Sequence, residues 1–72
     1  MIVSARPSRR FLRIHEVKRQ VGLGRSAIYM KIKSGEFPKP YPLSDSGRAV
    51  AWISDEIDGW IQSRINAVRG AK

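Results

Sequence analysis

The 72-residue sequence contains no cysteine and a single histidine. Disulfide bonds and thiolate metal sites are therefore excluded within it, and one imidazole is too few for a histidine-based metal site. No apolar run approaches the roughly 18 residues that span a bilayer, and the first residues lack the pattern of a secretory signal. We expect a cytoplasmic protein with no membrane association, no metal and no cofactor.

Catalytic chemistry also has little support in the sequence. Asp55, Glu56 and Asp58 form a cluster of carboxylates, but successive helical positions diverge around the axis, whereas paired acid-base catalysis needs convergent groups. Their placement at a helix start is explained by the helix dipole. There is no glycine-rich phosphate loop and no nucleophile elbow. We therefore predict that the protein is not an enzyme.

Positive charge is abundant and unevenly distributed. The formal net charge is +8, from fourteen lysines and arginines against six acidic residues. Residues 1–44 contain ten of the cations and two of the acids, whereas residues 45–72 contain four of each. Such a field attracts polyanions by releasing their counterions, and nucleic acid is the commonest such partner. The alternative is a solvated basic surface that serves solubility.

The basic half contains two segments with apolar residues at helical spacing, separated by the turn Gly22-Leu23-Gly24. The first predicted helix runs from about His15 to Val21, and Gly22 ends it by adopting a left-handed conformation. The second runs from about Arg25 to Ser34, with Gly24 as its N-cap. Two short helices around a glycine-containing turn are typical of a helix-turn-helix that reads DNA.

The second helix has an apolar inner face, with Ile28 and Ile32, and an opposite stripe of hydrogen-bond donors. Recognition helices present such donors to base edges and phosphates. On this helix we predict DNA contacts from Arg25, Ser26, Tyr29 and Lys33. At its flanks we predict phosphate contacts from Arg13, His15, Lys18 and Lys31. For Tyr29 an alternative stays open, in which the ring packs on the edge of the core and only its hydroxyl faces outward.

The segment Phe37-Pro38-Lys39-Pro40 cannot be helical, because two prolines remove donors and favour extended conformations before them. After this rigid connector, Tyr41–Leu43 and Arg48–Ile53 bracket a polar turn, which predicts a β-hairpin. Pro42 restricts the first strand to an edge. A hairpin after a helix-turn-helix is a wing, and we predict that its DNA contacts are Ser46, Gly47 and Arg48.

The remaining segment predicts a long amphipathic helix with Ser54 as its N-cap. Its apolar positions recur at helical spacing and predict a stripe that covers the core as a lid. They are Ile57, Trp60, Ile61, Ile65 and Val68. We predict one domain over residues 11–69, a flexible basic arm over 1–10 and a tail over 70–72.

Several fragments, taken in order, resemble one known family. They are Leu12-Arg13-Ile14, the run from Gly22 to Tyr29, the run from Gly35 to Pro40, the run from Gly47 to Trp52, and the last helix with Trp60-Ile61. Their order and spacing resemble the AlpA family of small phage and genomic-island regulators, related in fold to MerR-type winged helices and to excisionases. The resemblance covers about Phe11 to Arg69.

The resemblance implies a fold that is mainly α with a small β-hairpin, a winged helix-turn-helix. It places the family's recognition positions on Arg25, Ser26 and Tyr29, and the wing turn on Gly47 and Arg48. Two positions depart from the family pattern. Gly24 stands where the N-cap is usually Ser or Thr, and Met30 stands where a basic residue is frequent.

Our leading hypothesis is a sequence-specific DNA-binding transcriptional regulator of a prophage or integrated element, which controls integrase expression or excision. One alternative is an excisionase that bends attachment-site DNA. A second is a non-enzymatic protein–protein adaptor that uses the Trp60 helix. The expected partner is double-stranded DNA, with integrase or RNA polymerase as candidate protein partners. We expect a monomer or weak dimer that binds DNA cooperatively at the bacterial nucleoid.

Overall fold

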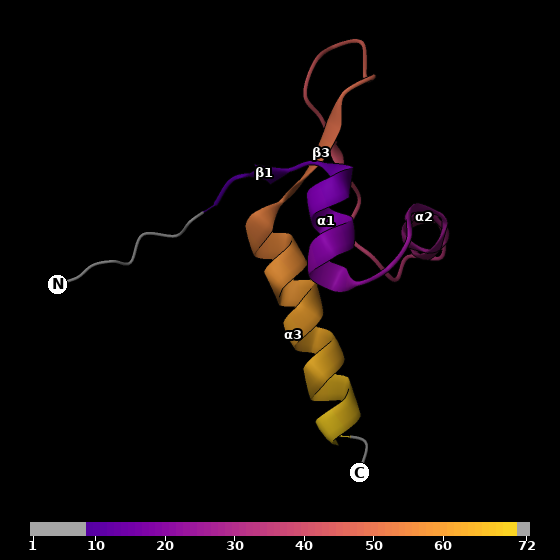
Figure 1. The fold of residues 1–72 in the computed structure, drawn as a ribbon, viewed down its shortest axis with the longest axis vertical. Coiled ribbons are helices and arrows are strands. Elements are labelled where there is room, and N and C mark those ends of the chain that lie inside the picture. Colours follow the sequence, from indigo (N-terminus) through magenta and orange to yellow (C-terminus); the bar gives the residue numbers. More distant parts are fainter. Residues whose placement is uncertain (1–8, 71–72) are drawn as a thin grey trace, which may run out of the picture.

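The computed structural model describes residues 9–70 of the chain. Its elements, in chain order, are β1 (Phe11–Leu12), α1 (Ile14–Val21), α2 (Arg25–Lys33), β2 (Tyr41–Pro42), β3 (Val50–Ile53) and α3 (Ser54–Gly70). The molecule is mainly helical with a small antiparallel sheet (Figure 1), which confirms the predicted fold class. None of the helices within residues 9–70 is both long and apolar enough to cross a membrane.

The sheet has the order β1-β3-β2, so the predicted hairpin strands are joined by a third strand. Pro42 lies in the edge strand β2, as predicted, opposite Val50. On the other side of β3, Leu12 lies opposite Trp52. Strand β1 is not predictable from the sequence, because a two-residue strand is defined by its partner and has no periodicity of its own.

The turn between α1 and α2 has the predicted conformations. Gly22 adopts a left-handed φ of 75° and ends α1 by donating its N–H to the Lys18 carbonyl at 2.9 Å. Gly24 is the extended N-cap of α2, with φ −78° and no side-chain cap. Gly35, with φ 83°, follows the C-cap Ser34. Left-handed glycines end helices at little steric cost.

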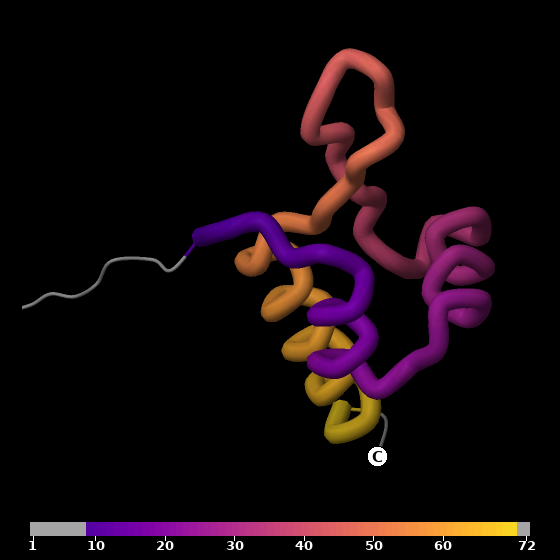
Figure 2. Tube along the Cα trace, turned by 45° about the horizontal axis from the view of Figure 1, so that its top comes forward, coloured from indigo at the N-terminus to yellow at the C-terminus, as the bar shows by residue number. Residues whose placement is uncertain are grey.

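The core is small and draws on every helix and on the sheet. Its buried residues are Leu12, Val17, Ile28, Phe37, Trp52 and Ile57. Trp52 is the largest fully buried side chain, with no exposed area. Because α1, α2 and α3 each contribute a residue to this cluster, the core sets the orientation of α2, which Figure 2 shows standing off to one side of α1 and α3.

The apolar stripe of α3 is only partly covered. Ile57 is buried and Ile61 is half-buried, but Ile65 is 39% exposed and Val68 is 70% exposed. The prediction that the whole stripe serves as a lid is therefore wrong for its second half. The reason is length: α3 has 17 residues and extends about 25 Å, whereas α1 has 8 and extends about 12 Å. Figure 1 shows α3 running past the end of α1.

Candidate nucleic-acid interface

Helix α2 lies beside the body formed by α1, α3 and the sheet, and its axis crosses theirs (Figure 1). Ile28 anchors it with a fully buried side chain, and the half-buried Ile32 packs against the same core. The opposite face is therefore turned to solvent. A short helix held by one apolar face is suited to insertion into a groove of DNA.

The exposed face of α2 carries donors and no acid. Arg25, Ser26, Met30 and Lys33 are all exposed, and Met30 reaches 72%. None of the nine residues of α2 is acidic. Neither Arg25 nor Lys33 forms an ion pair with any residue that the structure describes. Both cations are thus available to an anionic partner.

Tyr29 adopts the packed arrangement that the sequence analysis kept open. Its ring lies edge-on to the ring of Trp52, with centroids 6.2 Å apart and planes at 67°. The side chain is nevertheless 41% exposed. Edge-to-face contacts of this kind stabilise aromatic pairs, so Tyr29 joins the exposed face of α2 to the buried tryptophan of β3.

The predicted flanking residues are distributed over two helices. Arg13, the N-cap of α1, and the helical residues His15 and Lys18 are exposed. Lys31 of α2 is half-buried, and its Nζ lies 3.7 Å from Oε1 of Glu36. Lys31 is therefore already paired, whereas the polar groups of Arg13, His15 and Lys18 are exposed to solvent.

The tip of the wing is a closed turn. The N–H of Gly47 donates to the carbonyl of Ser44 at 3.0 Å, and the N–H of Arg48 donates to Oγ of Ser46 at 3.3 Å. The hydroxyls of Ser44 and Ser46 lie 3.0 Å apart. Gly47 is a predicted DNA contact, but its backbone N–H is used inside the turn. The exposed guanidinium of Arg48 and the serine hydroxyls remain at the surface.

Two tryptophans hold the connector between α2 and the wing. Nε1 of Trp52 donates to the Pro38 carbonyl at 2.9 Å, and Nε1 of Trp60 donates to the Glu36 carbonyl at 2.7 Å. The rings of Phe37 and Trp60 meet edge-on with centroids 4.9 Å apart. The sequence does not predict these bonds. A tryptophan in the core is expected to donate its indole N–H to an acceptor, but the sequence does not indicate which carbonyl accepts it.

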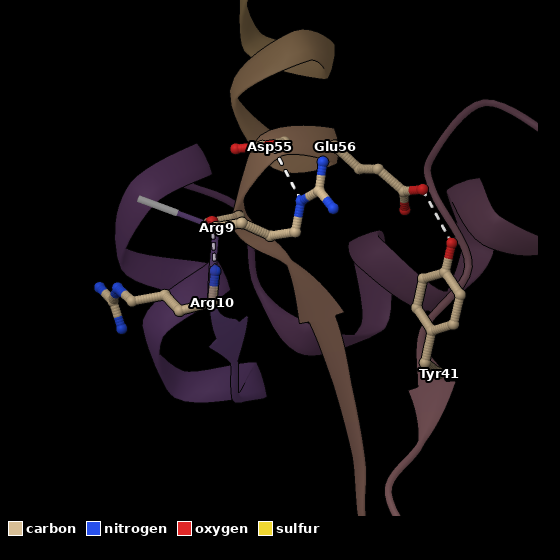
Figure 3. Close-up of polar contacts among 6 residues, drawn as sticks. Arg9, Arg10, Tyr41, Asp55 and Glu56 are labelled. Carbon is tan, nitrogen blue, oxygen red and sulfur yellow. Dashed lines mark hydrogen bonds and ion pairs between the residues drawn. The ribbon is translucent and has the colours of Figure 1, made fainter. Parts of the chain in front are cut away.

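The first turn of α3 is tied to the sheet and to the start of the domain (Figure 3). Nε of Arg9 lies 3.2 Å from Oδ2 of Asp55, and the hydroxyl of Tyr41 donates to Oε2 of Glu56 at 2.8 Å. The Glu56 carboxylate raises the pKa of the Tyr41 phenol above its ordinary value, chiefly through this hydrogen bond. The acids of this turn therefore make specific contacts in addition to facing the helix dipole.

The predicted basic arm, residues 1–10, falls mostly outside the described residues, but its last two residues are anchored. The N–H of Arg10 donates to Oγ of Ser54 at 2.9 Å, and the N–H of Ser54 donates to the Arg10 carbonyl at 2.9 Å. Helix α3 begins at Ser54 itself. Nη1 of Arg10 also lies 3.4 Å from Oε2 of Glu16. Arg9 and Arg10 thus join the folded domain.

Glu16 has a second contact at the start of α1. Its Oε1 accepts the N–H of Arg13 at 3.1 Å. This backbone hydrogen bond, assisted by the Arg10 guanidinium, holds the pKa of the Glu16 carboxyl below its ordinary value. Hydrogen bonds to the ionised form favour ionisation. The first turn of α1 is thereby capped by its own side chain.

The chain matches the family described as "Prophage CP4-57 regulatory protein (AlpA)" over residues 10–65. It belongs to the AlpA family. A protein of Enterobacteria phage P4, described as "Uncharacterized protein ORF88", is 46% identical over 56 residues, which are 78% of this chain and 61% of that protein. The chain thus matches about three fifths of this relative's length. No solved structure matches the chain.

Membership of the AlpA family confirms the resemblance predicted from the sequence and makes this a protein of a prophage regulatory family. All predicted contact residues, from Arg13 to Arg48, lie inside the matched range. Residues 66–70, the end of α3 in this AlpA protein, lie outside it. Within residues 9–70, no three histidine, aspartate or glutamate side chains come together as a metal site.

Proposed function

We propose that this AlpA-family protein is a non-enzymatic, sequence-specific DNA-binding transcriptional regulator of a prophage or integrated element. The observation that carries the proposal is the exposed face of α2, where Arg25, Ser26 and Lys33 stand without any acidic neighbour in the helix. An α-helix fits the major groove, and arginine pairs bidentately with the O6 and N7 atoms of guanine. On this proposal α2 is the recognition helix.

Met30 and Tyr29 extend the same reading face. Met30 is 72% exposed and apolar. Apolar side chains in the major groove contact the C5-methyl group of thymine. A basic residue at this position would contact phosphate instead, so Met30 favours a role in base discrimination. Tyr29, braced by the Trp52 ring, offers a donor whose position is restricted by packing.

The wing supplies a second contact in this proposal. Arg48 and the hydroxyls of Ser44 and Ser46 are exposed at its tip, and groups of this kind contact phosphate oxygens. The connector between α2 and the wing is held by the indole bonds to Glu36 and Pro38. The two contacts would therefore keep a constant spacing along the duplex.

The proposal is tested by comparing DNA sequences at matched salt. The purified protein is titrated, by fluorescence anisotropy, into duplexes from the promoter and attachment regions of the element that encodes it, and into random duplexes of equal length. We expect a preferred duplex bound at least about 10³-fold more tightly than random DNA. Equal affinity for all duplexes would overturn the sequence-specific function.

A matched pair of variants tests the role of α2. Arg25→Ala removes a cation from the proposed reading face, whereas Arg9→Ala removes one two residues before β1. Strand β1 and helix α2 lie on opposite sides of α1 (Figure 1). If Arg25 reads a guanine, its loss should cost about 1–3 kcal/mol on the preferred duplex and much less on random DNA. Arg9→Ala should affect both duplexes equally and weakly. An equal loss on every duplex with Arg25→Ala would identify a phosphate contact.

Transcriptional control and excision are separated by a reconstituted reaction. Purified protein, integrase and attachment-site DNA are combined without any transcription. A transcriptional regulator leaves the amount of excised product unchanged. Excision that depends on the protein under these conditions would replace the proposed function with the excisionase alternative.

A further inference from the structure

The end of α3 carries an apolar seam that the described residues cover only in part. Ile61, Ile65 and Val68 follow one another at spacings of four and three, which place them on one side of a helix. Ile61 is half-buried against the core, but Ile65 is 39% exposed and Val68 is 70% exposed. This spacing is that of the seam through which helices pair in coiled coils.

The seam lies about a quarter turn around α3 from the side that faces the connector after α2. Trp60 marks the side of α3 that faces the connector after α2, because its indole donates to the Glu36 carbonyl. At about 100° per residue, Val68, Ile61 and Ile65 lie roughly 80°, 100° and 140° around the helix from Trp60. Arg69 lies about 180° around. A partner bound on the side of Ile65 and Arg69 therefore leaves α2 free.

The charges of α3 are segregated along its length. Asp55, Glu56 and Asp58 lie in its first five residues, whereas Arg64 and Arg69 lie in its last seven. Asp55 and Glu56 are bonded to other elements. Asp58 and Arg69 are exposed, and neither forms an ion pair with a residue that the structure describes.

Asp58 and Arg69 also share one side of the helix. They are eleven residues apart, which is about three full turns. In an antiparallel pair of α3 helices, Asp58 of each copy would lie opposite Arg69 of the other, one ion pair at each end of the contact. Ile65 would then lie against Ile61 of the second copy. A parallel pair would bring like charges together at both ends.

We propose that the exposed part of α3 associates with a second copy of this chain in an antiparallel, two-fold arrangement. The contact is small, since stable interfaces bury about 1,200–2,000 Å² and three turns of helix provide less. We therefore expect a dissociation constant on the order of 100 µM at low salt. DNA that binds both copies would raise the dimer population, and its site would then be an inverted repeat; this last consequence rests on the proposed function.

Charge reversal tests the arrangement directly. Sedimentation equilibrium is measured without DNA, from about 10 µM to about 1 mM protein, for wild type, Asp58→Arg and Arg69→Asp. Each single variant places like charges at both ends of its own dimer and should sediment as a monomer. An equimolar mixture of the two variants restores both ion pairs and should associate like the wild type. A wild type that stays monomeric throughout, or a mixture that fails to associate, would overturn the proposal.

A second pair of variants tests the apolar seam. Val68→Glu places a charge within the contact and should weaken self-association at least tenfold. Ser63→Glu introduces the same charge on the opposite side of α3, where Ser63 is exposed, and should leave association unchanged. Circular dichroism checks that both variants keep their helix. Association that survives Val68→Glu would contradict the seam. Because DNA is absent, these results are independent of whether the protein binds DNA.

Discussion

Two glycines flank Leu23 in the turn before α2, and their backbone φ angles have opposite signs. Gly22 is left-handed with φ 75°, whereas Gly24 is extended with φ −78°. Beyond the two adjacent residues, no heavy atom lies within 4 Å of a Cβ added at either position. A serine would therefore have room at both positions, and its effect on stability depends on the backbone conformation at each position.

We predict that Gly24→Ser stabilises the protein by about 0.5–1 kcal/mol, because its hydroxyl caps the first turn of α2 and the unfolded chain loses freedom. Gly22→Ser should destabilise it by about 1–2 kcal/mol, because the left-handed conformation is strained for serine. Urea denaturation of both variants measures the difference. A loss of stability with Gly24→Ser would show that its extended backbone does not act as an N-cap.

The carboxyl of Glu16 provides a prediction on pH. Its pKa in the folded protein is lowered, chiefly by the hydrogen bond from the Arg13 N–H and then by the Arg10 guanidinium. A lowered folded pKa contributes stability above the ordinary glutamate pKa, and the contribution is lost as the pH falls through the folded pKa. Glu16→Gln should therefore reduce stability more at pH 7 than at pH 3. An equal reduction at both pH values, measured by thermal denaturation, would contradict this origin.

Single-residue contacts divide into those that sequence can predict and those that it cannot. The exposure of Arg25, Ser26 and Lys33 follows from helical spacing, which is a local property of the chain. The pairing of Lys31 with Glu36 and the contact of Tyr29 with Trp52 depend on how α2 and β3 meet. Those contacts are known only from the tertiary structure, because the sequence around one residue does not indicate which distant residue it contacts.

At the scale of elements, the connector after α2 is the feature that joins the two proposed DNA contacts. Trp60→Phe keeps an aromatic ring against Phe37 but removes the N–H that donates to the Glu36 carbonyl. We predict a loss of about 1 kcal/mol in unfolding free energy, the typical net value of one hydrogen bond. Binding to the preferred duplex should weaken as well, because α2 and the wing are no longer held at one spacing.

Tyr41→Phe is the control for this change. It also removes one hydrogen bond between elements, the one that the Tyr41 hydroxyl of β2 donates to the Glu56 carboxylate of α3. Both side chains are exposed, so the carboxylate regains water and stability should change by less than about 0.5 kcal/mol. Urea denaturation and anisotropy titration measure both variants. If Trp60→Phe changes DNA binding no more than Tyr41→Phe does, the indole bond does not set the spacing.

Elements with their own pattern are predictable from the sequence, and elements defined by a neighbour are not. Helices α1 and α2 and the hairpin have apolar spacing or turn residues, and their predicted ranges match the structure to within two residues at each strand or helix end. Strand β1 exists through its pairing with β3. The exposed end of α3 reflects the shortness of α1, since an apolar stripe is buried only where another element faces it.

At the scale of the whole molecule, the positive charge predicts how DNA binding responds to salt. Three described ion pairs occupy Arg9, Arg10 and Lys31, while Arg25 and Lys33 on α2 and Arg48 on the wing remain without carboxylate partners among residues 9–70. Contact with four to six phosphates would give a slope of about −4 to −5 for log affinity against log salt. Anisotropy titrations between about 50 and 200 mM salt measure this slope.

Arg25→Ala should make the slope shallower by about one if Arg25 binds phosphate and leave it unchanged if Arg25 reads a base. A wild-type slope near zero would contradict an interface built on the basic residues of α1, α2 and the wing, because release of condensed counterions is unavoidable when cations bind phosphates.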